Sequence, residues 1–340
     1  MHVLWDPVVR PALEIIHPQI IVEIGTEDGK TTKKILESCA TWNAVLHTID
    51  PKPLLNPEEW KKVWEDHFVF HKKRSLEVLN EIPFPDAVLI DGDHNWYTVF
   101  YELKILEERA KKENRNFPLV FLHDIAWPYA RRDLYYDIDA IPAEYRRPHA
   151  KGGVLHGQQA LSDNGLNACH IHALEEGTPK NGVLTAVEDF LKQTDMYLSF
   201  HVIAGYHGIG ILTAKESSEP LRKFIASLAE APFLKTQITL LETVWYDQLG
   251  IQAVWQRKNT ELDEHAISLR DELASYAKDR AALVKMIEHL QEQNETLHTE
   301  IGLPHAALEK DRLLLHRILQ SKSWRWTAPL RKLESILHRS

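Results

Sequence analysis

Short apolar runs alternate with helical patterns along the first two thirds of the chain. Apolar runs rich in β-branched residues predict buried strands at residues 20–24, 44–49, 87–90, 119–122, 197–203 and 208–213. Helical periodicity lies between the first four, at residues 31–38, 57–65, 75–80 and 96–112. This alternation predicts an α/β fold with a doubly wound parallel sheet. Because the last two strands closely flank Gly205, we expect them to form an antiparallel hairpin.

A heptad pattern begins near Leu234 and becomes regular from Leu262. One core position holds Leu262, Leu269, Tyr276, Leu283, Leu290 and Leu297, and the other holds Ala266, Leu273, Arg280, Ile287, Asn294 and Ile301. No Gly or Pro interrupts residues 251–301, so the pattern predicts a coiled coil. Asn294 favours a parallel dimer, whereas Arg280 leaves a trimer open. The alternative is a long helix packed on its own domain.

The chain therefore divides into three predicted parts: a catalytic domain over residues 1–233, a coiled-coil oligomerisation helix over 234–303, and a basic tail over 304–340. Residues 310–340 contain eight Lys/Arg and two acids. With Trp324 and Trp326, this composition suits an amphipathic helix in a lipid interface. A helical cap that packs on the coiled coil or on the catalytic domain is the equal alternative.

The overall charge and the cysteines exclude several classes of protein. A net charge of −9 argues against a general nucleic-acid binder. The two cysteines, Cys39 and Cys169, provide neither a disulfide framework nor zinc-site spacing. No apolar run is long enough to span a bilayer and no export signal is visible, so we expect a cytoplasmic protein.

The first chemical motif is IIVEIGTEDGKTT at residues 20–32. Gly25 and Gly29 let the backbone approach a ligand, while Glu23 and Asp50, at the ends of the first two strands, can accept hydrogen bonds from hydroxyl or amino groups. The loop lacks the G-x-G-x-x-G spacing that cradles a pyrophosphate. The motif therefore favours S-adenosylmethionine over a dinucleotide.

The segments VEIGTEDG, HTID and FPDAVLIDGDHNWYTVFYELK together resemble the class I S-adenosylmethionine-dependent methyltransferases, and among them the metal-dependent O-methyltransferases that act on sugars and small molecules. The resemblance covers residues 18–213 and implies a Rossmann-like, seven-stranded sheet. It also implies that the cofactor's methionine moiety lies against the first motif and its ribose against the second strand end. The implied cofactor-binding residues are Glu23, Gly25, Thr26, Gly29, Asp50 and Asp91.

A second constellation follows two further strands: Asp91-Gly92-Asp93-His94 and His123-Asp124. Adjacent strand ends would bring Asp91, His123 and Asp124 together as ligands for Mg²⁺ or Mn²⁺, which would orient and acidify a substrate hydroxyl. The resemblance places metal ligands at Asp91 and Asp124 and departs at His123, where several relatives carry an acid. The rival interpretation is metal-free catalysis with His94 or His123 as the general base. The candidate catalytic residues are Asp91, His94 and His123.

An aromatic and basic segment, residues 127–136, follows directly. We interpret Tyr129, Arg131 and Arg132 as substrate-binding residues, because aromatic faces and guanidinium groups hold sugar rings or acidic groups. The alternative is a packed lid whose arginines pair with nearby acids. Residues 141–180 read as an irregular insertion over the acceptor, in which the cluster at 169–172 is loop rather than a metal site.

These patterns predict an O-methyltransferase that acts on a sugar hydroxyl of a bacterial surface polysaccharide or lipid-linked glycan. The glycan assignment comes from resemblance, since FLHDIAWPYARRDLYY, IPAEYR and NGVLTAVEDFL are similar to methyltransferases of polysaccharide assembly, and SWRWTAPLRKL to tails of glycan-assembly proteins. The expected partners are the glycan acceptor, further copies of the chain, and the inner face of the plasma membrane through residues 310–340. Two alternatives remain: a natural-product-tailoring methyltransferase with a soluble acceptor, and a non-catalytic coiled-coil scaffold for glycan-assembly enzymes.

Overall fold

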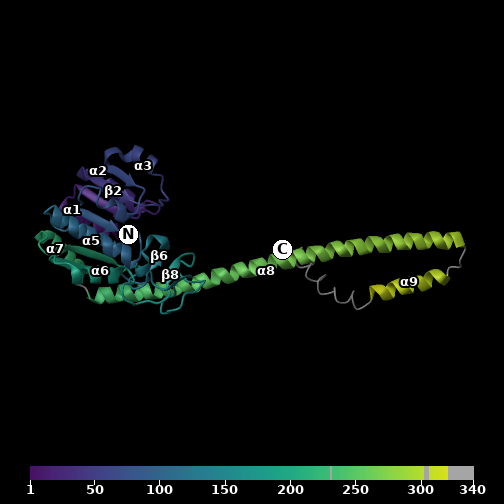
Figure 1. The fold of residues 1–340 in the computed structure, drawn as a ribbon. Coiled ribbons are helices and arrows are strands. Elements are labelled where there is room, and N and C mark those ends of the chain that lie inside the picture. Colours follow the sequence, from purple (N-terminus) through teal and green to yellow (C-terminus); the bar gives the residue numbers. More distant parts are fainter. Residues whose placement is uncertain (230–231, 302–305, 321–340) are drawn as a thin grey trace. The chain divides into compact units, whose positions relative to one another are not determined.

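The computed structural model describes the chain except residues 230–231, 302–305 and 321–340. The chain forms two compact units, Met1–Trp255 and Gln256–Ser340. The first unit contains a seven-stranded sheet with helices on both faces (Figure 1). Its strands are β1 (Ile20–Ile24), β2 (Val45–Ile49), β3 (Phe68–His71), β4 (Ala87–Ile90), β5 (Leu119–His123), β9 (Leu198–Ile203) and β10 (Ile209–Ala214).

The strand order is β3-β2-β1-β4-β5-β10-β9, in which β10 runs antiparallel to both of its neighbours and the remaining pairs are parallel. This arrangement confirms the predicted fold class, a Rossmann-like seven-stranded sheet with an antiparallel final hairpin. The order reverses between β1 and β4, where a doubly wound sheet opens a crevice for ligands. Strand β3 is not among the strands predicted individually. Its four residues lie at the sheet edge and three are only half-buried, so it lacks the continuous apolar run of a central strand.

Two apolar layers hold the helices onto the sheet. One face packs against α4 (Ser75–Val78), α5 (Trp96–Lys112) and α6 (Val183–Gln193). The other packs against α1 (Arg10–Ile16), α2 (Lys30–Trp42) and α7 (Glu219–Ala229), together with the helical turns His2–Leu4 and Trp5–Val9. Helix α3 (Pro57–Trp64) contacts β3. The buried strand residues belong to both layers, which explains why their sequences are almost continuously apolar.

The segment predicted to be an irregular insertion carries a small second sheet. Its strands are β6 (Leu134–Tyr135), β8 (Ile171–Ala173) and β7 (His149–Lys151), in that order and antiparallel. His172 lies in the central strand and is fully buried, so the interpretation of residues 169–172 as loop is wrong for its second half. Strands of two or three residues are too short to show a period-2 pattern, and the sequence therefore does not reveal them.

One buried carboxylate joins this second sheet to the main domain. Asp133, next to β6, accepts hydrogen bonds from the first backbone N–H of α5, at Trp96 (2.7 Å), and from the N-cap N–H of α6, at Gly182 (2.6 Å). Its second oxygen accepts from the hydroxyl of Tyr135 at 2.8 Å. Backbone N–H groups at helix starts have no partner within the helix and carry partial positive charge, so a single anion stabilises both helix starts.

Helix α8 (Pro232–Ile301) begins beside the predicted boundary at residue 233, but the first compact unit extends along it to Trp255. Its leucines at one predicted core position are largely exposed in the single chain, with exposed fractions of 46% to 60% at Leu262, Leu269, Leu283, Leu290 and Leu297. Helix α9 (Ala306–Leu319) follows. The helices of the described residues include none with enough length and apolar character to cross a bilayer. Most of the predicted membrane-binding tail, from residue 321 on, lies outside the described residues.

Candidate active site

The carboxyl ends of β1, β4 and β5 place the two predicted motifs side by side. Gly25 follows β1, and its backbone N–H bonds to the carbonyl of Ile49 at 2.9 Å. Its φ is +87°, and a Cβ there would lie 2.3 Å from the carbonyl oxygen of Asp91, the residue after β4. Only glycine permits this approach. The neighbouring strand β5 ends at His123, and Asp124 follows with a left-handed φ of +58°.

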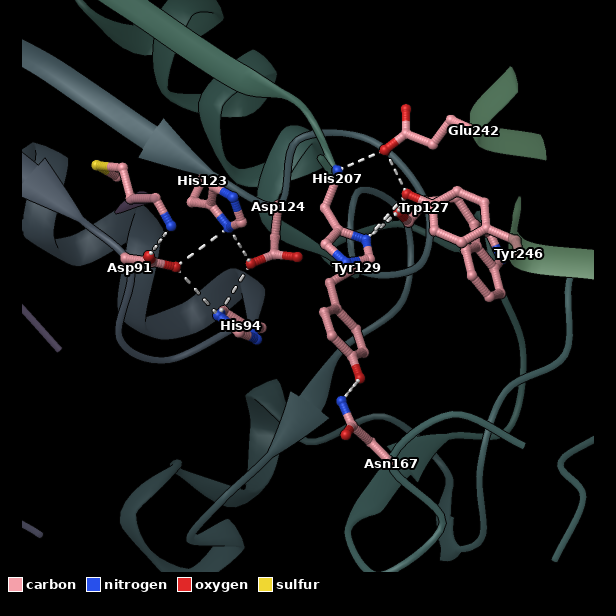
Figure 2. Close-up of polar contacts among 11 residues, drawn as sticks. Asp91, His94, His123, Asp124, Trp127, Tyr129, Asn167, His207, Glu242 and Tyr246 are labelled. Atoms are coloured by element: carbon pink, nitrogen blue, oxygen red, sulfur yellow. Dashed lines mark hydrogen bonds and ion pairs between the residues drawn. The ribbon is translucent and has the colours of Figure 1, made fainter. Parts of the chain in front are cut away.

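Two carboxylates and two imidazoles converge at this edge of the sheet (Figure 2). His123 Nδ1 lies 3.2 Å from Asp91 Oδ1 and 2.8 Å from Asp124 Oδ2. His94 Nε2 lies 3.2 Å from the same Asp124 oxygen and 3.9 Å from Asp91 Oδ1. The exposed fractions of the four side chains are only 6% to 24%. The structure thus brings together all four residues that the sequence predicts for catalysis or metal binding.

The charges of this cluster are strongly interdependent. Burial disfavours a charged His123, but the nearby carboxylates of Asp91 and Asp124 outweigh burial and raise its pKa to about 10. Burial alone would raise the pKa of Asp124, yet the two histidines lower it to about 2. The pKa of His94 is raised in the same way, against the effect of burial. Within the chain itself, the carboxylates are therefore balanced by protonated imidazoles, and Asp91 also pairs with the α-amino group of Met1 at 2.9 Å.

The same donors fit a divalent cation. One ligand atom from each of Asp91, His123 and Asp124 lies within 4.8 Å of the others. Two carboxylate oxygens and one imidazole nitrogen suit Mg²⁺ or Mn²⁺, which prefer hard ligands and keep open positions for substrate oxygens. A bound cation would replace the protons that now balance the carboxylates.

Glu23 is a buried acid on β1, within electrostatic reach of Asp91 and Asp50. Its side chain is 1% exposed, neither carboxylate oxygen has a hydrogen-bond partner among the described residues, and the nearby Thr32 hydroxyl partly offsets the effect of burial on its pKa. Burial raises its pKa to about 8. A buried acceptor without a partner costs free energy, and such a group calls for a hydrogen-bonding or cationic ligand. Glu23 therefore fits the ammonium group of a bound amino acid or of a cofactor with an amino-acid moiety.

Asp50 already accepts three hydrogen bonds within the chain. Its Oδ2 accepts from both the backbone N–H (2.9 Å) and the hydroxyl (2.8 Å) of Thr26, and its Oδ1 accepts from the N–H of Lys52 (2.8 Å). These bonds hold the glycine loop against β2. A carboxylate has about four acceptor positions, so one remains for a ligand donor. Thr26 thus supports the loop, and Gly29, with a φ of +81°, is the N-cap residue of α2.

The two predicted substrate-binding arginines hold the protein together instead. Arg131 forms two hydrogen bonds, of 2.6 and 2.7 Å, with the carboxylate of Glu188. Arg132 is 1% exposed and donates to the carbonyls of Ala173, Leu174 and Gln159. The terminal nitrogens of both guanidinium groups donate to these partners, so the contacts within the chain are structural, and a role in acceptor binding stays a prediction. The packed-lid alternative describes them better, although their partners are not the acids nearest in sequence.

Tyr129, the third predicted substrate residue, is 3% exposed and supports His94. The two rings stack with centroids 5.0 Å apart, and His172 stacks behind Tyr129 at 5.9 Å. The amide of Asn167 donates to the Tyr129 hydroxyl (Figure 2). The sequence does not single out Asn167, since an asparagine in an irregular segment carries no recognisable signal.

Two further residues contact the histidines of the cluster. Tyr136 meets His94 edge-on at 5.7 Å between ring centroids and is 46% exposed, so it joins the cluster to solvent. His207, from the β9–β10 turn, lies 6.2 Å from His123 between ring centroids. Tyr136 thus lies between the cluster and solvent, and His207 lies beside His123.

No protein-family model matches the chain, and no curated protein matches it. Among solved structures, it is similar to the SAH-bound methyltransferase PaMTH1 of Podospora anserina, at 12% identity and a TM-score of 0.38 over 60% of this chain and 75% of that one. A second similar structure is the 1,6-didemethyltoxoflavin-N1-methyltransferase of Burkholderia thailandensis, at 15% identity and a TM-score of 0.33 over 61% and 78%. A third is human N-acetylserotonin methyltransferase, at 13% identity and a TM-score of 0.32 over 64% and 54%. Likeness of this degree says nothing about the reaction of this chain.

Proposed function

We propose that the chain is an S-adenosylmethionine-dependent O-methyltransferase assisted by a divalent cation. The observation that carries the proposal is the buried carboxylate of Glu23, for which the described residues offer no geometric hydrogen bond. It lies beside the turn at Gly25 that only glycine can form, and within reach of the charge of Asp91. An amino-acid ammonium would satisfy Glu23, and the cluster would then lie beside the transferred methyl group. The absence of a phosphate-binding glycine pattern supports a cofactor without phosphate.

The roles of the residues follow from their positions. Asp91, His123 and Asp124 would hold the cation, which lowers the pKa of a coordinated hydroxyl and orients it. In the transfer, an O–CH₃ bond forms as the S–CH₃ bond breaks, and the hydroxyl proton must leave. His94 lies against both carboxylates and would accept that proton, because a cation between the carboxylates removes the charge that otherwise keeps His94 protonated. Tyr129 and Asn167 hold the His94 ring in place.

Titration of S-adenosylmethionine into the full chain by calorimetry tests the cofactor. We expect Glu23→Gln to weaken binding at least about tenfold, because it removes a charged hydrogen bond from a buried site. Since Glu23 is mostly protonated below its pKa of about 8, pairing with an ammonium should also release a proton at pH 7. The measured enthalpy should then differ between phosphate and Tris buffers.

The matched control is Glu77→Gln, an exposed acid on α4 whose replacement should leave the affinity unchanged. No binding of S-adenosylmethionine to the wild-type chain, with or without Mn²⁺, would refute the proposal. Equal binding by Glu23→Gln and wild type would remove Glu23 from the cofactor site.

We also propose self-association through α8, with a second copy of the chain as the partner. The exposed leucines at heptad spacing and the absence of Gly and Pro support a coiled coil. Light scattering after size exclusion should give a dimer or trimer for the wild type and a monomer for a Leu283→Asp, Leu290→Asp double variant. Exposed Glu288→Ala serves as the control. A monomeric wild type would contradict the proposal.

For the acceptor, we propose a sugar hydroxyl on a surface polysaccharide or lipid-linked glycan, with residues 310–340 bringing the enzyme to the membrane that carries it. The support is the sequence resemblance and the basic, Trp-containing composition of the tail. Labelled methyl transfer to lipid-linked glycan in anionic vesicles should exceed transfer to the same free oligosaccharide. Equal transfer to both would favour the soluble-acceptor alternative.

A further inference from the structure

The turn between β9 and β10 has an unusual backbone. Four consecutive residues, Gly205, Tyr206, His207 and Gly208, have positive φ angles of 106°, 50°, 67° and 77°. Two of them, Tyr206 and His207, are not glycine, and the left-handed region is unfavourable for residues that carry a Cβ. A turn of this kind persists only where surrounding contacts hold it.

Helix α8 supplies those contacts through two residues one helical turn apart. Glu242 Oε1 accepts from the backbone N–H of His207 at 2.6 Å and from the Tyr246 hydroxyl at 2.6 Å (Figure 2). The Tyr246 oxygen also lies 2.9 Å from His207 Nδ1, and the two rings stack at 5.4 Å. Burial, together with Glu242, raises the pKa of Tyr246, so the phenol stays protonated and donates.

The same contacts reach the loop that follows Asp124. The backbone carbonyl of His207 accepts a hydrogen bond from the N–H of Ala126 at 2.8 Å. The Nδ1 atom of the His207 ring lies 3.2 Å from the carbonyl oxygen of Trp127. The Trp127 ring packs on Tyr246 with centroids 4.4 Å apart. Helix α8, the strained turn and the loop after Asp124 therefore form one hydrogen-bonded network, and His207 lies against His123.

We infer that Glu242 and Tyr246 are positioning residues for the proposed active site, and that the first turns of α8 are part of the catalytic unit. By holding His207 and the Trp127 carbonyl, they keep the backbone after Asp124 in the conformation that aims its carboxylate at the cluster. The inference rests on the proposed function, because only that function makes the cluster an active site. The effect of Glu242 and Tyr246 on the backbone after Asp124 can be tested independently.

The test compares Glu242→Ala, Glu242→Gln and Tyr246→Phe in the full chain, with exposed Glu264→Ala of the same helix as the control. The readouts are Mn²⁺ affinity by electron paramagnetic resonance, S-adenosylmethionine affinity by calorimetry, melting temperature, and amide exchange at Ala126 and His207. We expect Glu242→Ala to weaken Mn²⁺ binding about 10- to 100-fold, as supporting residues of metal ligands do. The affinity for S-adenosylmethionine should stay within about twofold.

Glu242→Gln should restore most of the Mn²⁺ affinity, because its amide oxygen still accepts from His207, and Tyr246→Phe should fall between the two. Unchanged Mn²⁺ affinity in Glu242→Ala, or a loss that Gln does not restore, would overturn the inference. Failure of the wild type to bind Mn²⁺ and S-adenosylmethionine would refute the proposed function instead. Amide exchange then decides: faster exchange at Ala126 and His207 in the Ala variant alone supports the positioning role, and unchanged exchange refutes it.

Discussion

An Asp124→Asn variant is expected to lose Mn²⁺ affinity and methyl transfer by at least about 100-fold, since a cation ligand contributes several kcal/mol to such a site. Asparagine preserves the shape of the side chain and removes the charge that faces both His94 and His123. Calorimetry with Mn²⁺, and labelled methyl transfer from S-adenosylmethionine to the lipid-linked glycan, measure the two losses. Binding of S-adenosylmethionine should persist.

The matched control is Asp137→Asn, since Asp137 is 39% exposed and pairs with Arg74 away from the cluster. Asp124→Asn should also lower the pKa of His123, because it neutralises one of the two carboxylates that raise this pKa. Proton NMR of the His123 ring across pH 6 to 10 would record this change. Retained transfer and Mn²⁺ binding in Asp124→Asn would refute the metal-assisted mechanism and favour the histidine-only alternative.

The largest expected effect on stability comes from Arg132→Met. Removing the guanidinium leaves the carbonyls of Ala173, Leu174 and Gln159 without their donor. Only the bond to Ala173 is fully buried, and a buried acceptor without a partner costs about 1–3 kcal/mol, whereas water can reach the carbonyls of Leu174 and Gln159. We therefore expect the free energy of unfolding to fall by about 2–3 kcal/mol. Urea denaturation of the full chain, followed by tryptophan fluorescence, measures it.

The neighbouring Arg131→Met is the natural control. Its ion pair with Glu188 is 37% and 39% exposed, and solvent-exposed pairs contribute at most about 1 kcal/mol. Similar small losses in both variants would show that Arg132 is not a structural residue, and would reopen its predicted role in acceptor binding.

The sequence reveals the parts of the molecule whose structure depends on local patterns. Strands β1, β4 and β5 are apolar except for Glu23 and His123, because both of their faces are covered. Helix α5 has the helical periodicity and the Asn95 N-cap that mark its start. The sequence also predicts that the acids and histidines after β4 and β5 lie close together, because adjacent parallel strands end at the same edge of the sheet. A four-residue edge strand such as β3 has no such signal.

The missing parts of the site depend on contacts between residues far apart in the chain. Arg132 reaches the carbonyl of Ala173 in the second sheet and that of Gln159, and no local pattern distinguishes such an arginine from one on an exposed loop. Glu242 and Tyr246 read as ordinary heptad-region residues, since their role appears only when β10 brings His207 beside α8. Sequence patterns thus locate the chemistry but not the supports that hold it.

The position of Asp133 has a consequence for how such a protein can diversify. One carboxylate caps α5, which begins two residues after His94, and also caps α6. Any change in the second sheet that shifts Asp133 would shift the start of α5 and the imidazole before it. We therefore expect residues 133–182 to be exchangeable between homologous enzymes only as a block that keeps this aspartate. A grafted segment that lacks this aspartate would change the surface beside the site and would also displace His94.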